Sequence, residues 1–307
     1  MKLPVQQAGL YDLDIDDYHS QRVCPGPSIS SSGLRTVLRD CPAVFYAFSD
    51  LNPKRFEKPQ SKVFAFGRAS HALVLGEPEF NSKFIISPFD SFRTKESQLW
   101  RDEQTREIVR AEEMDVINQM VAAQKQSAEC MRAFTEGMPE KSLIWQDKET
   151  GVWLKSRPDW LPSKPAERFT TEYKTAESIK PRKLNNAVFD YGYEMQAALT
   201  VDAIEIVLGV KPLGIAHVVQ EKSPPYLVDC RLFTDEQISF GRMQVRKALR
   251  IFAKCIETDV WPGYTTEASY FETPFWVSKA MENFNDTIGD SNGSTPEYSA
   301  GDYLGAG

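Results

Sequence analysis

The pattern of apolar residues changes near residue 142, and this change most constrains what the chain can fold into. Residues 143–146 and 152–155 have the composition of two strands joined by the turn sequence 147–151, and residues 159–161 are expected to continue the second strand. Residues 168–175 are rich in β-branched and aromatic side chains and predict a third strand. The middle of the chain is therefore expected to form a β-sheet.

Helical patterns lie on both sides of these strands. Helices are expected over 33–39, 64–75, 193–208 and 234–257, with one or two more within 95–136, and further strands over 214–220 and 226–233. This order of elements predicts an α/β or α+β domain with a mixed central sheet. A content of 41% hydrophobic and 26% charged residues suits a folded chain rather than a disordered one.

The length of 307 residues permits one large domain or two small ones. We expect a single domain over residues 1–281, with a helical part at about 28–136 and a sheet core at about 140–260. Residues 282–307 are rich in Gly, Ser, Asn and Asp and are expected to form a disordered acidic tail.

Composition also limits the compartment and the class of ligand. The chain has no stretch of ~20 uninterrupted apolar residues and no apolar signal segment, so a soluble, cytoplasmic protein without a membrane partner is expected. Five dispersed cysteines without a C-x2-C pair predict free thiols, with neither a structural zinc site nor an iron–sulfur cluster. A net charge of −7 argues against nucleic-acid binding through whole-protein charge. A local basic groove, or a carboxylate site that binds nucleic acid through metal ions, stays open.

The densest polar pattern is Arg157-Pro158-Asp159, followed by Glu172-Tyr173-Lys174. Because alternate residues of a strand face the same side, Glu172 and Lys174 are expected to point together and Tyr173 away from them. Two carboxylates and a lysine on adjacent strands suit a Mg²⁺ site for phosphodiester hydrolysis, with the lysine stabilising charge or orienting water. The alternative is a solvated ion pair on a surface hairpin, which is the commoner outcome when these residue types are considered alone.

Two further features bear on this choice. His71 is a polar residue within an otherwise apolar predicted helix, and Gly67 lies one turn before it. Gln196 and Thr200 share one face of the helix predicted over 193–208. Taken singly, His71 is more often a satisfied core histidine, and Gln196 a residue at the polar margin of a helix.

In combination, the ordered motifs G-x-x-x-H, R-P-D, E-x-K-T and Y-x-x-Q-A resemble the PD-(D/E)XK nuclease superfamily, specifically the RecE (exonuclease VIII) type related to the RecB nuclease domain. Residues 18–19, 28–34 and 41–43 are similar to the opening segment of that type, and residues 261–264 to its closing motif. The resemblance covers about residues 10–275.

The resemblance implies a restriction-endonuclease-like core with a mixed central β-sheet flanked by helices. It also implies that His71, Asp159, Glu172 and the backbone carbonyl of Tyr173 are metal ligands and that Lys174 is the catalytic lysine. Gln196 matches the glutamine of the motif Q-x-x-x-Y and is a further catalytic candidate. Thr200 stands where that motif has tyrosine, so the role of the tyrosine stays open.

Contacts with DNA are expected from a small set of positive and polar side chains: Ser32, Arg35, Arg157, Lys180, Arg182 and Lys183. The last three, with Arg157, either line a groove along the phosphates or belong to a solvated loop. Ser32 and Arg35, at the predicted start of a helix, either bind a terminal 5′-phosphate or belong to an ordinary helix cap.

The activity implied is a Mg²⁺-dependent exonuclease on linear double-stranded DNA, with Mn²⁺ as the alternative metal. The resemblance further implies 5′→3′ digestion that leaves 3′ overhangs for recombination, a ring-like homo-oligomer and a RecT-like single-strand annealing partner, in a bacterial or phage-infected cell. It implies no iron–sulfur cluster, because the cysteines are not clustered. Two alternatives stay open, an endonuclease on the same fold and a catalytically weak protein that binds DNA ends.

Overall fold

The computed structural model describes residues 3–57, 62–265, 267–268 and 270–289. The chain divides into two compact units, residues 1–264 and 265–307. The second unit contains helix α12 (Phe275–Gly289). The boundary predicted after residue 281 falls inside this helix, so residues 282–289 are helical where the sequence predicts the start of a disordered tail. The rest of that predicted tail lies outside the described residues.

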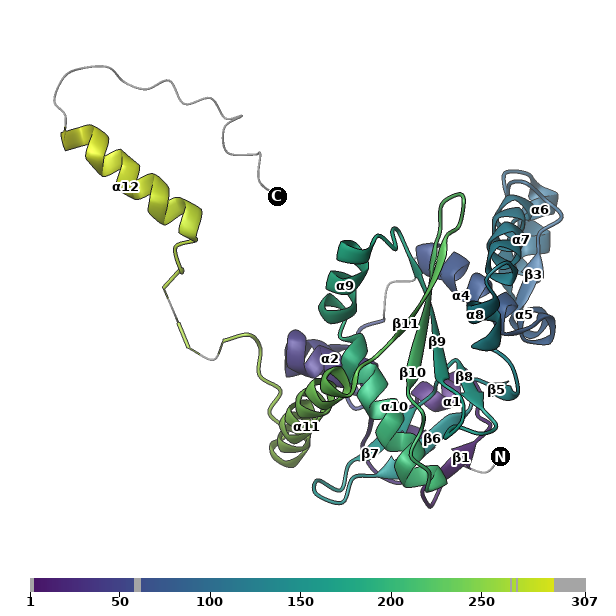
Figure 1. The fold of residues 1–307 in the computed structure, drawn as a ribbon, viewed down its shortest axis with the longest axis horizontal. Helices are drawn as coiled ribbons and strands as arrows, with labels where there is room; N and C mark the ends of the chain where they lie inside the picture. The colour runs from purple at the N-terminus through teal and green to yellow at the C-terminus, as the bar shows by residue number, and fades with distance from the viewer. Residues whose placement is uncertain (1–2, 58–61, 266, 269, 290–307) are drawn as a thin grey trace. The chain divides into compact units, whose positions relative to one another are not determined.

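Two mixed sheets form the centre of the first unit (Figure 1). One has the strand order β1-β6-β7-β2, and the other has the order β11-β10-β9-β8-β5. The bounds are β1 (Gly9–Tyr11), β2 (Ser28–Ser30), β5 (Gly137–Pro139), β6 (Ser142–Gln146), β7 (Trp153–Ser156), β8 (Trp160–Pro162), β9 (Thr170–Ala176), β10 (Ile215–Glu221) and β11 (Val228–Leu232). β9 and β10 run parallel, with Glu172 opposite His217. The predicted fold class, mixed sheet flanked by helices, is confirmed.

The prediction that residues 159–161 continue the second strand is wrong. β7 ends at Ser156 and pairs with β6 and β2, whereas β8 pairs with β5 and β9 in the other sheet. Pro158 lies between the two strands, and a proline has no backbone N–H with which to continue a strand ladder. The chain therefore passes from one sheet to the other here, and Asp159 lies on this connection.

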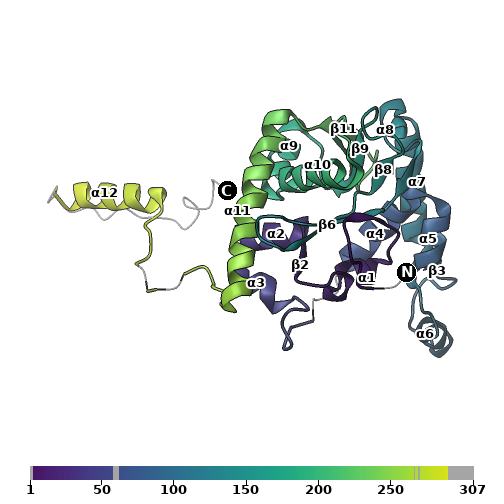
Figure 2. The same cartoon turned by 90° about the horizontal axis from the view of Figure 1, so that it is seen from below.

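Four helices and the first sheet build the main hydrophobic core. The helices are α2 (Ser31–Arg39), α3 (Pro42–Ala47), α10 (Tyr193–Leu208) and α11 (Asp235–Thr258). α11 packs along both α10 and α2 (Figure 2), and its Phe252 is buried in one cluster with Leu34 and Leu199. The predicted bounds of α10 are confirmed, and Thr234 and Gln237 form the predicted capping box at the start of α11.

A helical layer over residues 62–132 lies next to β9. It contains α4 (Lys62–Leu75), α5 (Glu77–Lys83), α6 (Lys95–Asp102), α7 (Ala111–Lys125), α8 (Ala128–Arg132) and the paired strands β3 (Phe84–Ile86) and β4 (Glu107–Val109). The sequence predicts one or two helices within 95–136, and the structure has three, with β4 between α6 and α7. α4 packs on α7 and contacts β9, which brings His71 to the second sheet.

The remaining elements of the first unit are short: α1 (Ile15–His19), the 3-10 turn η1 (Gln21–Val23) and α9 (Pro181–Asp190). None of the helices that the structure describes is long and apolar enough to cross a membrane.

The crossing of α10 and α11 depends on a glycine. A Cβ on Gly241 would stand 2.1 Å from the carbonyl oxygen of Glu194 and 3.0 Å from the Cβ of Ala198. Gly67, in contrast, has only the Thr175 hydroxyl, at 4.0 Å from the position of a Cβ. The first glycine therefore sets how closely the start of α10 approaches α11.

We expect Gly241→Ala to lower the free energy of unfolding by about 1–3 kcal/mol, because the added methyl forces α11 away from the Glu194 carbonyl. Gly67→Ala is the matched control within a helix and should be neutral or stabilising by up to about 1 kcal/mol. Urea unfolding of both variants measures the difference. Equal stability of the two variants would contradict a tight crossing at Gly241.

Candidate active site

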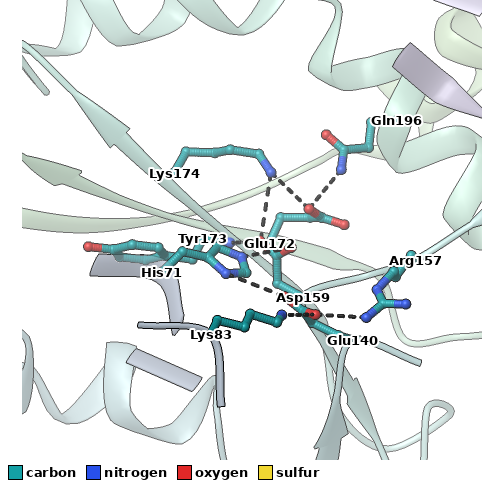
Figure 3. A network of polar contacts seen from close by, with 9 residues as sticks. All are labelled: His71, Lys83, Glu140, Arg157, Asp159, Glu172, Tyr173, Lys174 and Gln196. Carbon is teal, nitrogen blue, oxygen red and sulfur yellow. Dashed lines mark hydrogen bonds and ion pairs between the residues drawn. The ribbon is translucent and has the colours of Figure 1, made fainter. Parts of the chain in front are cut away.

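A cluster of polar side chains lies where β8, β9, α4 and α10 meet (Figure 3). Glu172 and Lys174 come from the same face of β9, Asp159 from the connection before β8, His71 from α4 and Gln196 from α10. The structure therefore brings together the side chains that sequence reasoning singled out in four separate parts of the chain.

Lys174 and Gln196 both bind Glu172. The ammonium of Lys174 lies 2.9 Å from Oε2 of Glu172, and the Gln196 amide donates a hydrogen bond of 2.7 Å to the same oxygen. The Lys174 ammonium also lies 3.7 Å from Oδ2 of Asp159. One cation therefore contacts both carboxylates, and Gln196 holds one of them in place.

Asp159 has two further partners. Its Oδ1 lies 3.0 Å from Nε2 of His71, and its Oδ2 accepts a hydrogen bond of 2.7 Å from the backbone N–H of Tyr173. The ring of Tyr173 lies on the opposite face of β9, as predicted, where its hydroxyl donates to Gln220 at 2.7 Å. The backbone around Tyr173 thus belongs to the site, while its side chain belongs to the core behind it.

Burial and mutual repulsion set the protonation of the carboxylates. Burial, together with the nearby charge of Asp159, raises the pKa of Glu172 to about 7. Burial would also raise the pKa of Asp159, but the charges of His71 and Lys174 outweigh it and hold that pKa below its usual range. Burial would lower the pKa of Lys174, yet the two carboxylates raise it above its ordinary value. Lys174 therefore stays protonated.

The donor set fits a hard divalent cation by its chemistry. Glu172 Oε1 is buried and has no hydrogen-bond partner among the described residues, and the raised pKa of Glu172 reflects a repulsion that a cation would relieve. Asp159 adds carboxylate oxygens and His71 an imidazole nitrogen. Within the described residues no group of three or more His, Cys, Asp or Glu side chains is already arranged as a metal centre. The Lys174 ammonium contacts the carboxylates instead.

Sequence reasoning missed Glu140. Its carboxylate lies 2.8 Å from Arg157, 3.1 Å from Lys83 and 3.7 Å from Nδ1 of His71 (Figure 3). Its backbone has a φ of 49°, in the left-handed region that non-glycine residues rarely adopt. Glu140 precedes β6 without any motif around it, so only the fold could place it beside His71. Its contact with His71 is an ion-pair distance rather than a hydrogen bond, and it is made to the ring nitrogen that Asp159 does not contact.

Thr200, at the position of the family tyrosine, does not reach these side chains. Its hydroxyl lies 2.9 Å from the hydroxyl of Ser156 on β7, and it is buried. Thr200 therefore links α10 to the first sheet. Of the two residues of this motif, Gln196 is the one that contacts Glu172.

Five of the six predicted DNA-binding residues divide into two groups. Ser32 and Arg157 line a cavity of about 180 Å³ together with Asp159 and Gln196. Ser30 and Ser32, whose hydroxyls lie 3.0 Å apart, also line a neighbouring cavity of about 650 Å³. Lys180, Arg182 and Lys183 are exposed around the start of α9 instead.

Arg35 has a structural partner. One of its terminal nitrogens donates a hydrogen bond of 2.7 Å to the backbone carbonyl of Tyr191. Ser30 is the N-cap residue of α2, but its side chain makes no capping hydrogen bond. An ordinary helix cap was one of the two alternatives for this segment, and the Ser30 hydroxyl does not form one.

A mixed sheet flanked by helices, with carboxylates and a lysine on β9 and on the connection before β8, is the arrangement expected of a PD-(D/E)XK-type protein. Residues 30–274 match the family described as PDDEXK-like domain of unknown function (DUF3799), and the chain belongs to this family. Among solved structures, it is similar to a protein from Eubacterium rectale described as a proposed exonuclease, with 13% identity and a TM-score of 0.58. That match covers 88% of this chain and 98% of the other. A comparison with curated proteins found no match.

The raised pKa of Glu172 generates a prediction for stability without divalent cations. The ordinary pKa of a glutamate side chain is 4.5, and that of folded Glu172 is about 7. Between these two pH values the folded protein keeps a proton on Glu172 that the unfolded chain releases. The contribution of Glu172 to the free energy of unfolding therefore falls as the pH rises. Glu172→Gln stays neutral, and its Tm should fall less than that of the wild type across this window. Thermal melting in EDTA at a series of pH values measures both.

Glu177→Gln serves as the control, because Glu177 is exposed just after β9. This variant should follow the wild-type curve. If Glu172→Gln follows that curve as well, the carboxyl of Glu172 does not carry the proton assigned to it.

Proposed function

We propose that this protein is a divalent-metal-dependent nuclease that hydrolyses linear double-stranded DNA from its ends. The observation that carries the proposal is the junction of Asp159, Glu172 and Lys174, where a buried carboxylate oxygen has no partner among the described residues. Membership of the PDDEXK-like family supports the same chemistry.

His71, Asp159, Glu172 and the backbone carbonyl of Tyr173 would hold Mg²⁺ or Mn²⁺. When bound there, the ion would supply Lewis-acid chemistry and would lower the pKa of a water molecule. Lys174, held protonated by the two carboxylates, stabilises the charge that develops on the phosphate oxygens. Gln196 acts as a positioning residue, because it fixes the carboxylate of Glu172.

The proposed direction of digestion is 5′→3′, with a 3′ overhang as the product for recombination. This finer assignment rests on the motifs shared with the RecE type, as do the ring-like homo-oligomer and the RecT-like annealing partner. The proposed exonuclease from Eubacterium rectale has a similar fold, which does not bear on the direction of digestion. A cytoplasmic location in a bacterial or phage-infected cell belongs to the same proposal.

The test follows the release of label from linear duplex DNA marked separately at its 5′ and 3′ ends, in Mg²⁺, Mn²⁺ or EDTA. Early release of the 5′ label is expected with either metal, and none in EDTA. Lys174→Ala should slow the reaction by about 100-fold or more, because it removes the cation beside the phosphate. Lys164→Ala is the matched control, since Lys164 is exposed and pairs only with Glu167 among its described contacts.

A covalently closed circle separates the alternatives. An exonuclease leaves the circle intact, whereas cleavage would replace the proposal with an endonuclease on the same fold. Folded protein that binds DNA ends but shows no turnover with either metal would favour the end-binding protein.

A further inference from the structure

An aromatic pair leads from the catalytic lysine to the protein surface. The ammonium of Lys174 lies 6.0 Å from the ring centroid of Tyr193. The rings of Tyr193 and Tyr191 are stacked, with centroids 5.7 Å apart and planes inclined by 30°. Tyr191 is 62% exposed. The pair therefore presents an aromatic ring to solvent, and only the ring of Tyr193 stands between it and Lys174 in this series of contacts.

The turn that carries Tyr191 joins α9 to α10 and is held by two arginines of α2. Arg35 donates to the carbonyl of Tyr191 at 2.7 Å, and Arg39 donates to the carbonyls of Phe189 and, at 3.0 Å, Asp190. Arg39 is also paired with the buried carboxylate of Glu194 at 2.7 Å. These bonds fix the backbone on both sides of the exposed ring.

Gly192 makes this close approach possible. Its φ is +66°, and a Cβ there would stand 2.9 Å from side-chain atoms of both Arg35 and Arg39. A side chain at this position would therefore strain the backbone and displace the arginines. The turn is thus pre-organised rather than free to adapt.

Tyr193 is held from the inner side by apolar packing. The ring of His217 lies 5.2 Å from that of Tyr193 and 4.9 Å from that of Phe233. Neither nitrogen of His217 has a hydrogen-bond partner among the described residues, so the imidazole acts here as a buried neutral ring. The ring of Tyr193 therefore lies between the buried ring of His217 and the exposed ring of Tyr191.

We propose that Tyr191 is a stacking platform for a nucleobase of the strand whose phosphate lies at Lys174. The inference rests on the proposed nuclease function and adds a base-binding subsite to it. A rigid aromatic ring binds any base through its face, which suits an enzyme that must accept every sequence. A strand advances about 3.4 Å per nucleotide along a duplex, so a base within a few nucleotides of the phosphate reaches Tyr191. The exposed Lys180, Arg182 and Lys183 around the start of α9 suit the phosphates of the same strand.

The test compares Tyr191→Ala, Tyr191→Leu and Tyr191→Phe, with Tyr264→Ala as the control at another exposed tyrosine. Affinity for end-labelled duplex and single-stranded oligonucleotides is measured by fluorescence anisotropy in the Lys174→Ala background, where turnover is suppressed. KM and kcat are measured with Lys174 intact. A 5-iodouracil near the DNA end, irradiated with long-wave ultraviolet light, identifies the stacked residue by mass spectrometry of the cross-link.

Tyr191→Ala and Tyr191→Leu are expected to raise Kd and KM about tenfold, equivalent to about 1.4 kcal/mol, with kcat changed far less. Tyr191→Phe should recover most of the affinity, because stacking needs the ring and not the hydroxyl. The cross-link should map to Tyr191, and Tyr264→Ala should behave as the wild type. A leucine side chain is large but has no aromatic face. Weak DNA binding by Tyr191→Leu would therefore show that the base stacks on the ring rather than only packing against a large side chain.

Wild-type affinity in Tyr191→Ala, with the cross-link elsewhere, would overturn the inference and leave the nuclease standing. Absence of turnover in the wild type, combined with weaker DNA binding in Tyr191→Ala, would overturn the nuclease and retain the base-binding site. Absence of both turnover and DNA binding would overturn the two together.

Discussion

Two carboxylates buried side by side make the strongest demand on this structure. Glu172 is buried and Asp159 is mostly buried, and the two carboxylates repel each other, so each requires a cation or a hydrogen-bond donor. Their partners come from α4, β9 and α10, and these elements must therefore meet at one place for the charges to be satisfied. The same packing of α4, β9 and α10 therefore forms the site and provides the carboxylates with their partners.

The scaffold meets this demand through two local features. Pro158 interrupts the strand ladder, which sends the chain from one sheet to the other and leaves Asp159 at the connection. Gly241 lets α11 approach the first turn of α10, and that turn carries Glu194, which is buried against Arg39, and Gln196. The ion pair of Glu194 with Arg39 and the hydrogen bond of Gln196 to Glu172 thus both come from the first turn of α10.

The acidic net charge of the chain is compatible with the proposed nucleic-acid substrate, because the contacts proposed for it are local. Lys174 and the aromatic pair of Tyr191 and Tyr193 lie along one side of the site, and Glu140 gathers Lys83 and Arg157 on another. Charges that compensate one another at short range contribute little to the long-range field. The proposed recognition is therefore by fixed contacts at the DNA end rather than by general attraction to phosphate.

The sequence by itself determined the helix bounds at 193–208, the capping box at Thr234 and the candidate residues of the site, because these depend on periodicity, local capping and short motifs. It could not show that β7 and β8 belong to different sheets, since strand pairing depends on contacts between distant segments. It also gave no sign of Glu140, which has no motif and reaches His71 only through the turn before β6. Only the tertiary structure decided these features, because burying the two carboxylates together requires partners from segments far apart in the chain.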